Sequence, residues 1–571
     1  MDRPLPPARS GCDTAALRDS ATRCAHPRAR AREGRESGGA CALLATLTVL
    51  AALSGVGCST YCSQHGCDGA GGAGGATSSS ASSQTSTSTS SISSSSTGVV
   101  MDCLPTLTAG PKDDTCGVFV DPNAGSDGAA GTMAAPQKTL GAALITWIPG
   151  KAIYVCDGAL TDTEPLTVQP GVIVYGGLDC GAGYRVKSDA ARTTLAPKAG
   201  AIPLTLTGGA AATELHQLAI TATADTAPGS SAIGVVVGDV SATLERVDIT
   251  ADDGVAGANS TTPTDNIGPS NPMDAMIVGN AGANANTMTP GTKNPGGPAK
   301  VNPLCQSIGG AGGDGGNIVA ATPQQGSLGD SGSATPLPPP LGMNNGQGGP
   351  GEIAIPCEAG HGGAPGAAVL DGAGASGPQS VGKLSLTGYQ GVSGAKGPDG
   401  NPGQGGGGGG GAKGKTSPDT RGASGGSGGA GGCGGHGAPG GGPGGASLAL
   451  VLLGASAPTL VDVTLVTGKG GDGGAGAAGQ FGATGGDGGA RGLGMGTTNA
   501  CIGGAGGQGS SGGAGGGGRG GHSVGIAYVT ALPASGFMVT HGAAGAAGTS
   551  AGAGTPADAG VADDVLQLGA Q

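Results

Sequence analysis

Four glycine ladders dominate the C-terminal half of this 571-residue chain. In each ladder glycine returns at every third place for seven positions, over Gly391–Gly409, Gly422–Gly440, Gly470–Gly488 and Gly503–Gly521. A strict three-residue period is that of a polyproline-II turn, and neither an α-helix nor a pleated strand repeats in this way. The ladders therefore predict extended segments, each about 59 Å long at roughly 3.1 Å per residue.

The ladders come in two pairs, so each pair predicts an antiparallel excursion, with turns at 410–421 and 489–502. Fixing the backbone costs roughly 1–2 kcal/mol per residue, or about 20–40 kcal/mol per ladder. Only backbone hydrogen bonds between several ladders packed side by side can offset that cost. Such packing resembles the polyglycine-II bundles of insect antifreeze and phage-fibre proteins. The alternative is a disordered glycine-rich linker, and a collagen triple helix is disfavoured because the ladders mostly lack proline.

Composition narrows the classes of partner. The chain has 129 glycines but one Trp, three Phe and six Tyr, which leaves little material for a conventional core. Its formal charge of −12, without basic runs beyond the N-terminal region, argues against nucleic acid. The sequence contains no convincing cofactor fingerprint, and we expect no cofactor.

The N-terminal region predicts export. Residues 1–57 end in an apolar run, Ala40–Leu53, preceded by arginines and followed by small residues. With Cys58 directly after it, this region resembles a bacterial lipoprotein signal, which implies a lipid anchor on Cys58 and sorting to the outer membrane. Cleavage by the ordinary signal peptidase, giving a secreted product, is the alternative. Residues 58–102 are rich in Ser and Thr and predict a flexible tether.

Residues 103–254 carry short apolar runs separated by small turn residues. Leu215–Ile220 and Leu244–Ile249 share one template, 29 residues apart. The stretch 117–144, with Val172–Gly177, resembles the opening of the pectin-lyase-like superfamily. The resemblance implies an all-β fold, a right-handed parallel β-helix (a solenoid), with the glycine tracts as polyglycine-II-like or disordered insertions.

The rest of the chain divides into three parts. Residues 255–365 predict an irregular insertion, and 543–571 form an Ala/Gly-rich tail. Between them, 366–542 alternate further coils with the ladders; coils are expected at 366–388, 447–468 and 523–542.

Ten cysteines follow Cys58, and an even number in an exported chain favours disulfides over metal or thiol chemistry. Spacing alone does not determine the pairing. Proximity in the sequence favours five pairs: Cys62–Cys67, Cys103–Cys116, Cys156–Cys180, Cys305–Cys357 and Cys433–Cys501.

Catalytic and metal signals are weak. A polysaccharide lyase needs a carboxylate cluster, and Asp248, Asp252 and Asp253 near Glu245 and Arg246 are the densest such group; a charged turn is the simpler interpretation. The run Gly309–Asp314 approaches a calcium-binding nonapeptide but lacks its large apolar residue. We therefore assign no catalytic or metal-binding residue.

With its lipoprotein-like signal, its Ser/Thr-rich tether and its glycine ladders, the chain resembles the glycine-rich surface lipoproteins of high-GC bacteria such as myxobacteria. Its glycine tracts are similar to those of the glycine-alanine-rich surface proteins of mycobacteria. The resemblance implies a non-enzymatic structural or adhesive role at the cell surface, with extracellular polysaccharide or a neighbouring cell as partner. The alternatives are a carbohydrate-active enzyme and a passive spacer without a ligand.

Overall fold

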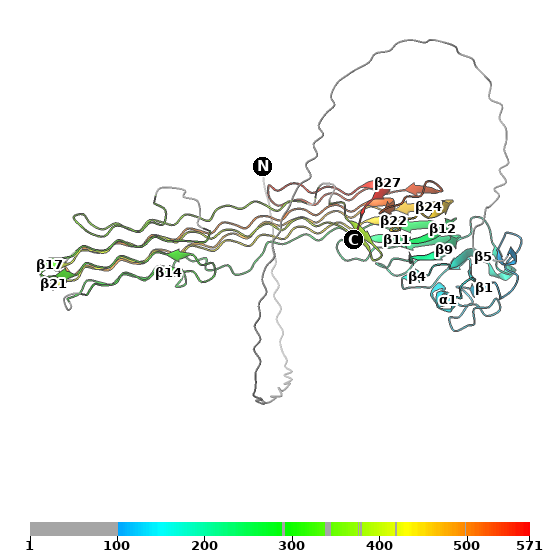
Figure 1. Ribbon diagram of the computed structural model, residues 1–571, viewed down its shortest axis with the longest axis horizontal. Helices are drawn as coiled ribbons and strands as arrows, with labels where there is room; N and C mark the ends of the chain where they lie inside the picture. The colour runs from blue at the N-terminus through cyan, green and yellow to red at the C-terminus, as the bar shows by residue number, and fades with distance from the viewer. Residues whose placement is uncertain are drawn as a thin grey trace, which may run out of the picture. The chain divides into compact units, whose positions relative to one another are not determined.

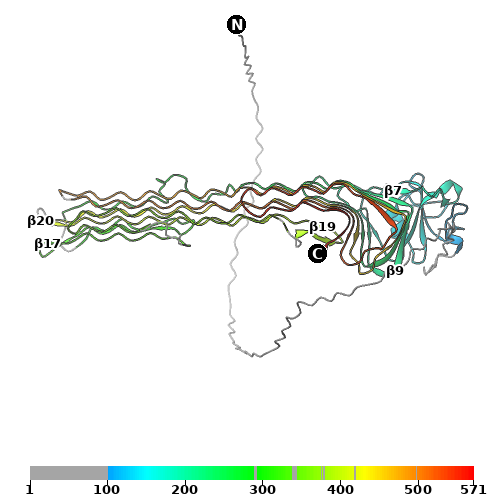
Figure 2. The ribbon, with the colours of Figure 1, turned by 90° about the horizontal axis from the view of Figure 1, so that it is seen from above.

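The computed structural model describes residues 101–287, 292–336, 344–374, 376, 380–416, 419–496 and 498–571. These residues form three parallel β-sheets and a bundle of extended, glycine-rich segments that runs on from them (Figure 1). Seen from above, the extended segments run side by side over their whole length (Figure 2).

The strands of the three sheets pair in parallel across long sequence separations, apart from β6, which is antiparallel to β5. The first sheet consists, in spatial order, of β1 (Gly117–Val120), β2 (Ala152–Cys156), β5 (Ile173–Asp179), β9 (Gly209–His216), β12 (Val240–Glu245) and β23 (Thr459–Val461), with β6 (Arg185–Val186) beside β5. The second consists of β3 (Gly158–Ala159), β7 (Thr193–Leu195), β10 (Leu218–Ala222), β13 (Asp248–Ala251), β24 (Val463–Thr467) and β26 (Phe537–Thr540). The third consists of β4 (Leu166–Val168), β8 (Leu204–Leu206), β11 (Ala232–Val237), β22 (Ser447–Leu452), β25 (Ser523–Tyr528) and β27 (Ala562–Gln567).

The shared template of 215–220 and 244–249 sets the strand register. Leu244 pairs with Leu215 in the first sheet, and Ile249 pairs with Ile220 in the second. Alternate residues of β10 are buried, as expected where successive side chains point to opposite faces. Strands of all three sheets contribute Leu, Ile and Val side chains to one continuous core.

The strands of the third sheet are buried on both faces. Every residue of β11 and β22 is buried, because a second apolar cluster covers the outer face of this sheet. That cluster brings Leu384 and Leu568 against Val236 and Leu448. The last residues of the chain therefore close over the sheet.

A short helix, α1 (Leu140–Thr146), packs against the core near β1. The Thr139 hydroxyl caps it by accepting from the Ala142 amide at 3.2 Å. The carboxylate of buried Asp162 accepts from the amides of Leu140 and Gly141 at 3.0 and 2.8 Å. Burial raises the pKa of Asp162, although these two hydrogen bonds oppose the shift.

The remaining short elements lie outside the three sheets. Two single turns of 3-10 helix are η1 (Met101–Cys103) and η2 (Cys180–Ala182). Small pairs are formed by β14 (Lys300–Val301) with β15 (Ile308–Gly309), β16 (Ile318–Val319) with β17 (Thr322–Pro323), β20 (Lys415–Thr416) with β21 (Asp419–Thr420), and β18 (Lys383–Ser385) with β19 (Gly388–Gln390) and β28 (Gly569–Ala570).

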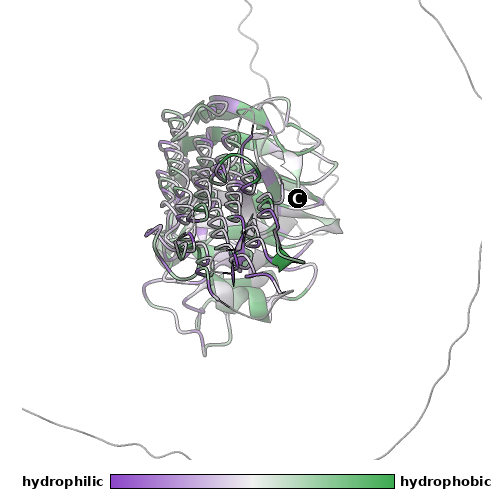
Figure 3. Cartoon of the chain, turned by 90° about the vertical axis from the view of Figure 1, so that its left-hand side faces the viewer, coloured by the Kyte–Doolittle hydropathy of each residue, from purple (hydrophilic) through white to green (hydrophobic). Residues whose placement is uncertain are grey.

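We call the extended part the glycine bundle; its segments are 254–287, 292–336, 344–374, 391–416, 419–446, 468–493, 500–522 and 542–560. The first and second ladders are antiparallel, with the Gly394 amide donating to Gly441 O and the Gly406 amide to Gly429 O. The third and fourth ladders are antiparallel as well. The first pair turns at β20 and β21, inside the predicted turn 410–421. Viewed along the bundle, the segments stand end-on in neighbouring rows (Figure 3).

The predicted fold class, an all-β right-handed parallel β-helix with glycine-rich insertions, is wrong. The described residues form three parallel sheets of six or seven strands with few helices, an α/β-like arrangement, and parallel sheets are not evidence of a β-helix. Regularly spaced apolar runs predict parallel pairing, but they do not define the fold class. The coil expected at 366–388 also differs, since Gly366 donates to Gln508 O inside the bundle and β18 pairs with β19 and β28.

Candidate functional site

The largest ordered feature that the ladders build is the interior of the glycine bundle, around the run of seven glycines Gly405–Gly411. The backbone of each residue in this run is buried. Three consecutive amides, those of Gly406, Gly407 and Gly408, donate to three different segments, with acceptors Gly429 O, His361 O and Asp330 O at 2.9 Å each. Their carbonyl oxygens accept from Gly310 N, Gly504 N and Gly349 N at 2.9, 2.8 and 2.8 Å. Gly504 belongs to a fourth segment, whereas Gly310 and Gly349 are second contacts from the segments 292–336 and 344–374.

Gly406, Gly407 and Gly408 therefore contact six stretches of backbone from four segments, and their amides and carbonyls are paired without any side chain. A Cβ atom built on Gly406 would overlap the carbonyl oxygen of Gly504, and one on Gly407 would overlap that of Gln347. Because successive residues face different segments, every position of the run must be glycine. This explains a run of seven glycines where the outer ladders keep glycine only at every third or at two of three positions.

In the second ladder some of the positions between the every-third glycines are also glycine, and two of the exceptions, Ser424 and Ser427, face the segment 254–287. The hydroxyls of Ser424 and Ser427, which are fully buried, accept from the amides of Ala283 and Asn280 at 2.6 and 2.8 Å. A small polar residue thus replaces one carbonyl acceptor. The insertion 255–365 contributes these neighbours.

Some amides of the bundle donate to partly exposed carboxylates and not to backbone carbonyls. Asp399 accepts from the Gly437 amide at 2.8 Å, and Asp472 from the Ala546 amide at 2.8 Å. These hydrogen bonds are the main reason that the pKa of each carboxyl lies below its usual value. The carboxylates of Asp399 and Asp472 therefore pair with backbone amides of neighbouring segments.

Two disulfides lock the bundle. The structure pairs Cys305 with Cys433 and Cys357 with Cys501, so the predicted pairs Cys305–Cys357 and Cys433–Cys501 are wrong. Each bond joins the insertion to a ladder region, because the insertion folds back along the ladders instead of closing on itself. In the sheet region Cys103–Cys116 and Cys156–Cys180 are bonded as expected from proximity.

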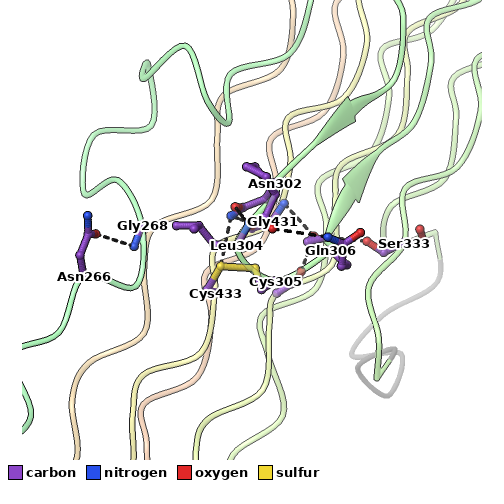
Figure 4. Close-up of a disulfide and its surroundings, with 12 residues drawn as sticks. Asn266, Gly268, Asn302, Leu304, Cys305, Gln306, Ser333, Gly431 and Cys433 are labelled. Carbon is purple, nitrogen blue, oxygen red and sulfur yellow. Dashed lines mark hydrogen bonds between the residues drawn. A yellow bond between two sulfur atoms is a disulfide. The ribbon is translucent and has the colours of Figure 1, made fainter. Parts of the chain in front are cut away.

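Polar side chains hold the Cys305–Cys433 bond in place (Figure 4). Asn302, which is fully buried, donates through Nδ2 to Gly431 O at 3.0 Å and to the Cys433 Sγ at 3.3 Å. Ser307 donates to Gly403 O at 2.8 Å and accepts from the Gly431 amide at 2.9 Å. Leu304 beside them is exposed and borders a shallow hollow with Asn266 and Gly268. Sequence reasoning missed Asn302 and Ser307, which have no periodic signal.

The predicted lipidation site Cys58 and the pair Cys62–Cys67 lie outside the described residues. Among the described residues, no helix has the length and apolar character needed to cross a bilayer. The four disulfides among the described residues suggest an oxidising, exported environment for the chain.

Each of the carboxylates considered for lyase chemistry, Asp248, Asp252 and Asp253, interacts with a different neighbouring residue. Asp248 forms an ion pair with Arg192 at 3.2 Å, without hydrogen-bond geometry. Asp252 accepts from the Thr223 hydroxyl at 2.7 Å, and Asp253 accepts from the Lys469 amide at 2.6 Å. Within the described residues, no three of the four carboxylates, Glu245 included, place their oxygens close enough together to share a metal ion.

Glu245 belongs to a different cluster, on the outer face of the first sheet. His216 lies between Glu245 at 3.1 Å and Glu214 at 3.2 Å, and Arg246 reaches Glu245 at 3.0 Å. Burial by itself lowers the pKa of His216, but the hydrogen bonds to both glutamates outweigh burial and raise it. The hydrogen bond from His216 lowers the pKa of Glu245, against the effect of burial.

His216 is also the end of an aromatic row. The rings of Phe119, Tyr154, Tyr175 and His216 stack across paired positions of neighbouring strands. Burial raises the pKa values of the tyrosines Tyr154 and Tyr175 far above their usual range. The 29-residue repeat would have placed His216 beside Glu245, so the cluster had a signal that sequence reasoning did not use.

One group of potential metal ligands comes together among the described residues: Asp121, Cys156 and Cys180. The two sulfur atoms are bonded to each other, so neither offers a thiolate. This group does not fit a metal centre.

A shallow hollow of about 340 Å³ lies at the end of α1, beside the first sheet. Its lining includes the only Trp of the chain, Trp147, with Gln169 and Glu214. Glu214 thus connects the hollow with the His216 cluster.

Comparison with protein-family models, curated proteins and solved structures finds no significant match to this chain.

Proposed function

We propose that this protein is an exported, non-enzymatic surface protein with a structural or adhesive role, anchored by a lipid on Cys58. The glycine bundle is the part that contacts extracellular polysaccharide or a neighbouring cell surface. The observation that carries the proposal is the bundle itself, in which backbone pairing and two long-range disulfides order residues that a mere linker would leave solvated.

Two further observations support this proposal over the enzyme. The carboxylates around Asp248 are each engaged by a different structural partner. Near Glu245, the acidic groups are held by His216 and Arg246 within the sheet face, an arrangement that stabilises neighbouring strands.

The first test is co-sedimentation of the full chain, carrying Cys58→Ser to remove the anchor, with isolated cell envelope and insoluble polysaccharides. We expect the chain to sediment with one of these without releasing soluble sugars, and the Gly406→Ala variant to sediment less. Release of unsaturated or reducing ends would replace the adhesive function by an enzymatic one. A chain that stays in the supernatant and releases nothing is a spacer.

The anchor is tested separately by metabolic labelling with palmitate. We expect the wild-type chain to take up the label and to fractionate with membranes. The Cys58→Ser variant should lose both properties. An unlabelled wild-type chain in the medium would rule out the anchor and leave a secreted product.

A further inference from the structure

The hollow beside α1 combines an aromatic side chain, small residues and hydrogen-bonding groups at one place. Trp147, Pro149 and Pro170 supply flat apolar walls, and Ala211 and Ala212, both exposed, leave a floor without bulky side chains. The volume of about 340 Å³ is at the lower end of that of small-molecule sites. The hollow therefore has room for one or two sugar-sized rings.

The indole of Trp147 is fixed in position. Its Nε1 donates to Lys151 O at 2.7 Å, which holds the pyrrole edge against the turn that follows α1. The Cη2 corner of the six-membered ring lies beside Gly171, where a built Cβ would be 3.9 Å away. Since Trp147 is only half-buried, part of its ring contributes to the wall of the hollow.

The Glu214 carboxylate lines the hollow, and in the described part of the chain only one of its two oxygens has a hydrogen-bond partner. Its Oε2 is bound by His216 at 3.2 Å, whereas Oε1 has no hydrogen-bond or ion-pair partner among the described residues. The side chain is 19% exposed, so Oε1 is a positioned acceptor at a wet surface. The exposed amide of Gln169 is a second polar group on the same hollow.

This chemistry selects among ligands. Apolar C–H faces pack on an indole while hydroxyls donate to a carboxylate oxygen, which is what a pyranose ring offers. An anionic sugar would be repelled by Glu214 and by the net charge of −12. A cation is disfavoured because His216 already stands beside the Glu214 carboxylate.

We propose that the hollow lined by Trp147, Gln169 and Glu214 binds one neutral sugar ring of a polysaccharide. The ring stacks on Trp147, and its hydroxyls donate to Glu214 Oε1 and pair with the amide of Gln169. This site goes beyond the proposed function, because it lies on the sheets and not on the glycine bundle. Either can fail without the other.

The experiment uses the single tryptophan as its reporter. The full chain carrying Cys58→Ser is titrated with maltoheptaose, cellohexaose and chitohexaose, with indole fluorescence excited where tyrosine does not absorb. We expect a saturable shift of the emission with at least one of these neutral probes. Polygalacturonate and choline serve as the anionic and cationic probes and should give none.

Three variants locate the site. Glu214→Gln should weaken binding about tenfold, because the sugar hydroxyl then donates to a neutral amide oxygen in place of a charged carboxylate oxygen. Gln169→Ala, at an exposed position, should weaken it severalfold without a change in the circular dichroism. Glu245→Gln is the matched control, because Glu245 holds the same histidine but does not line the hollow. It should leave binding within about twofold, below the effect of one lost hydrogen bond.

Several results would overturn the proposal. These are no shift with any neutral probe at millimolar concentration, a shift with choline or polygalacturonate only, or equal effects of Glu214→Gln and Glu245→Gln. Sedimentation with polysaccharide that survives Glu214→Gln would leave the adhesive function to the bundle and remove the hollow from it.

Discussion

Replacing Gly406 by alanine tests whether close packing of backbones holds the glycine bundle together. The added Cβ would lie well inside 3.0 Å of Gly504 O, a distance that real Cβ atoms essentially never show. Because the neighbouring atom belongs to a backbone, two segments must move apart. The hydrogen bonds from Gly406 to Gly429 and from Gly429 to Gly504, both 2.9 Å long, then lengthen or break.

The magnitude follows from those two hydrogen bonds. A buried amide or carbonyl left without a partner costs about 1–3 kcal/mol, so two disrupted bonds cost about 2–6 kcal/mol. The alanine also lowers the entropy of the unfolded chain, which stabilises the folded state by about 0.4–1 kcal/mol. We expect Gly406→Ala to destabilise the bundle by about 1–5.6 kcal/mol, as the difference of these two effects.

The matched control is Gly362→Ala, in a neighbouring segment of the same bundle. A Cβ on Gly362 meets only Ala505 O, at an ordinary contact distance of 3.7 Å. This variant should be neutral or slightly stabilising, by up to about 1 kcal/mol. Amide hydrogen exchange of peptides covering 403–412, followed by mass spectrometry, measures the opening free energy of the bundle directly. Equal protection in Gly406→Ala and Gly362→Ala would refute the close-packing argument.

Three more predictions concern pH and the disulfides. Burial is the main cause that lowers the pKa of His522 to about 4. Between pH 6.5 and 4 the unfolded chain therefore binds a proton that the folded chain does not bind, and the free energy of unfolding should fall over this window by up to about 3 kcal/mol. His522→Gln should remove this pH dependence in thermal melts. The raised pKa of His216 has the opposite sign, so its contribution is complete below pH 6.5 and is lost as pH rises through the folded-state pKa; His216→Gln should flatten the alkaline side of the same profile. Replacing Cys357 and Cys501 together by serine opens a 144-residue loop and should lower the opening free energy of the bundle by about 5 kcal/mol in exchange measurements.

Each of these has an outcome that counts against it. An acid slope that persists in His522→Gln would assign the titration to another group, as would an unchanged alkaline limb in His216→Gln. For the disulfide, the control is the 13-residue loop of Cys103–Cys116, worth about 3 kcal/mol on the same scale and placed in the sheets. Bundle exchange that responds equally to both losses would contradict the local role of Cys357–Cys501.

The ladders predicted part of the bundle because one frame of glycines persists over seven triplets. Antiparallel excursions and the first turn follow directly from that frame. The insertion 255–365 was predicted to be irregular because its frames are short: Gly326, Gly329 and Gly332 keep one, and Gly360 and Gly363 keep another that continues to Gly366. Each short frame of glycines packs against one neighbouring segment, and the turns between the frames interrupt the three-residue period.

In the sheets, the template shared by 215–220 and 244–249 matches the register that pairs Leu215 with Leu244, but it did not define the fold class. The His216 cluster was not predicted, although the same 29-residue repeat places His216 opposite Glu245. Disulfide pairing in the bundle could not be predicted from the sequence. Cys305 and Cys433 are 128 residues apart, and their contact depends on how the insertion folds back.

The Cys305–Cys433 bond fixes the register of the insertion along the second ladder, which the glycine ladders by themselves do not fix. A glycine ladder looks nearly the same after a shift of one triplet, so its backbone pairing tolerates such slippage, as in other glycine-rich strands. A disulfide does not, since its two Cα atoms must lie within a narrow range of separation, 5.4 Å here. A shift of three residues moves a segment by about 9 Å and puts the two sulfur atoms out of reach. The oxidised protein is therefore confined to one alignment of the insertion on the second ladder, whereas a reduced chain is free to trap misaligned forms that are just as well hydrogen-bonded.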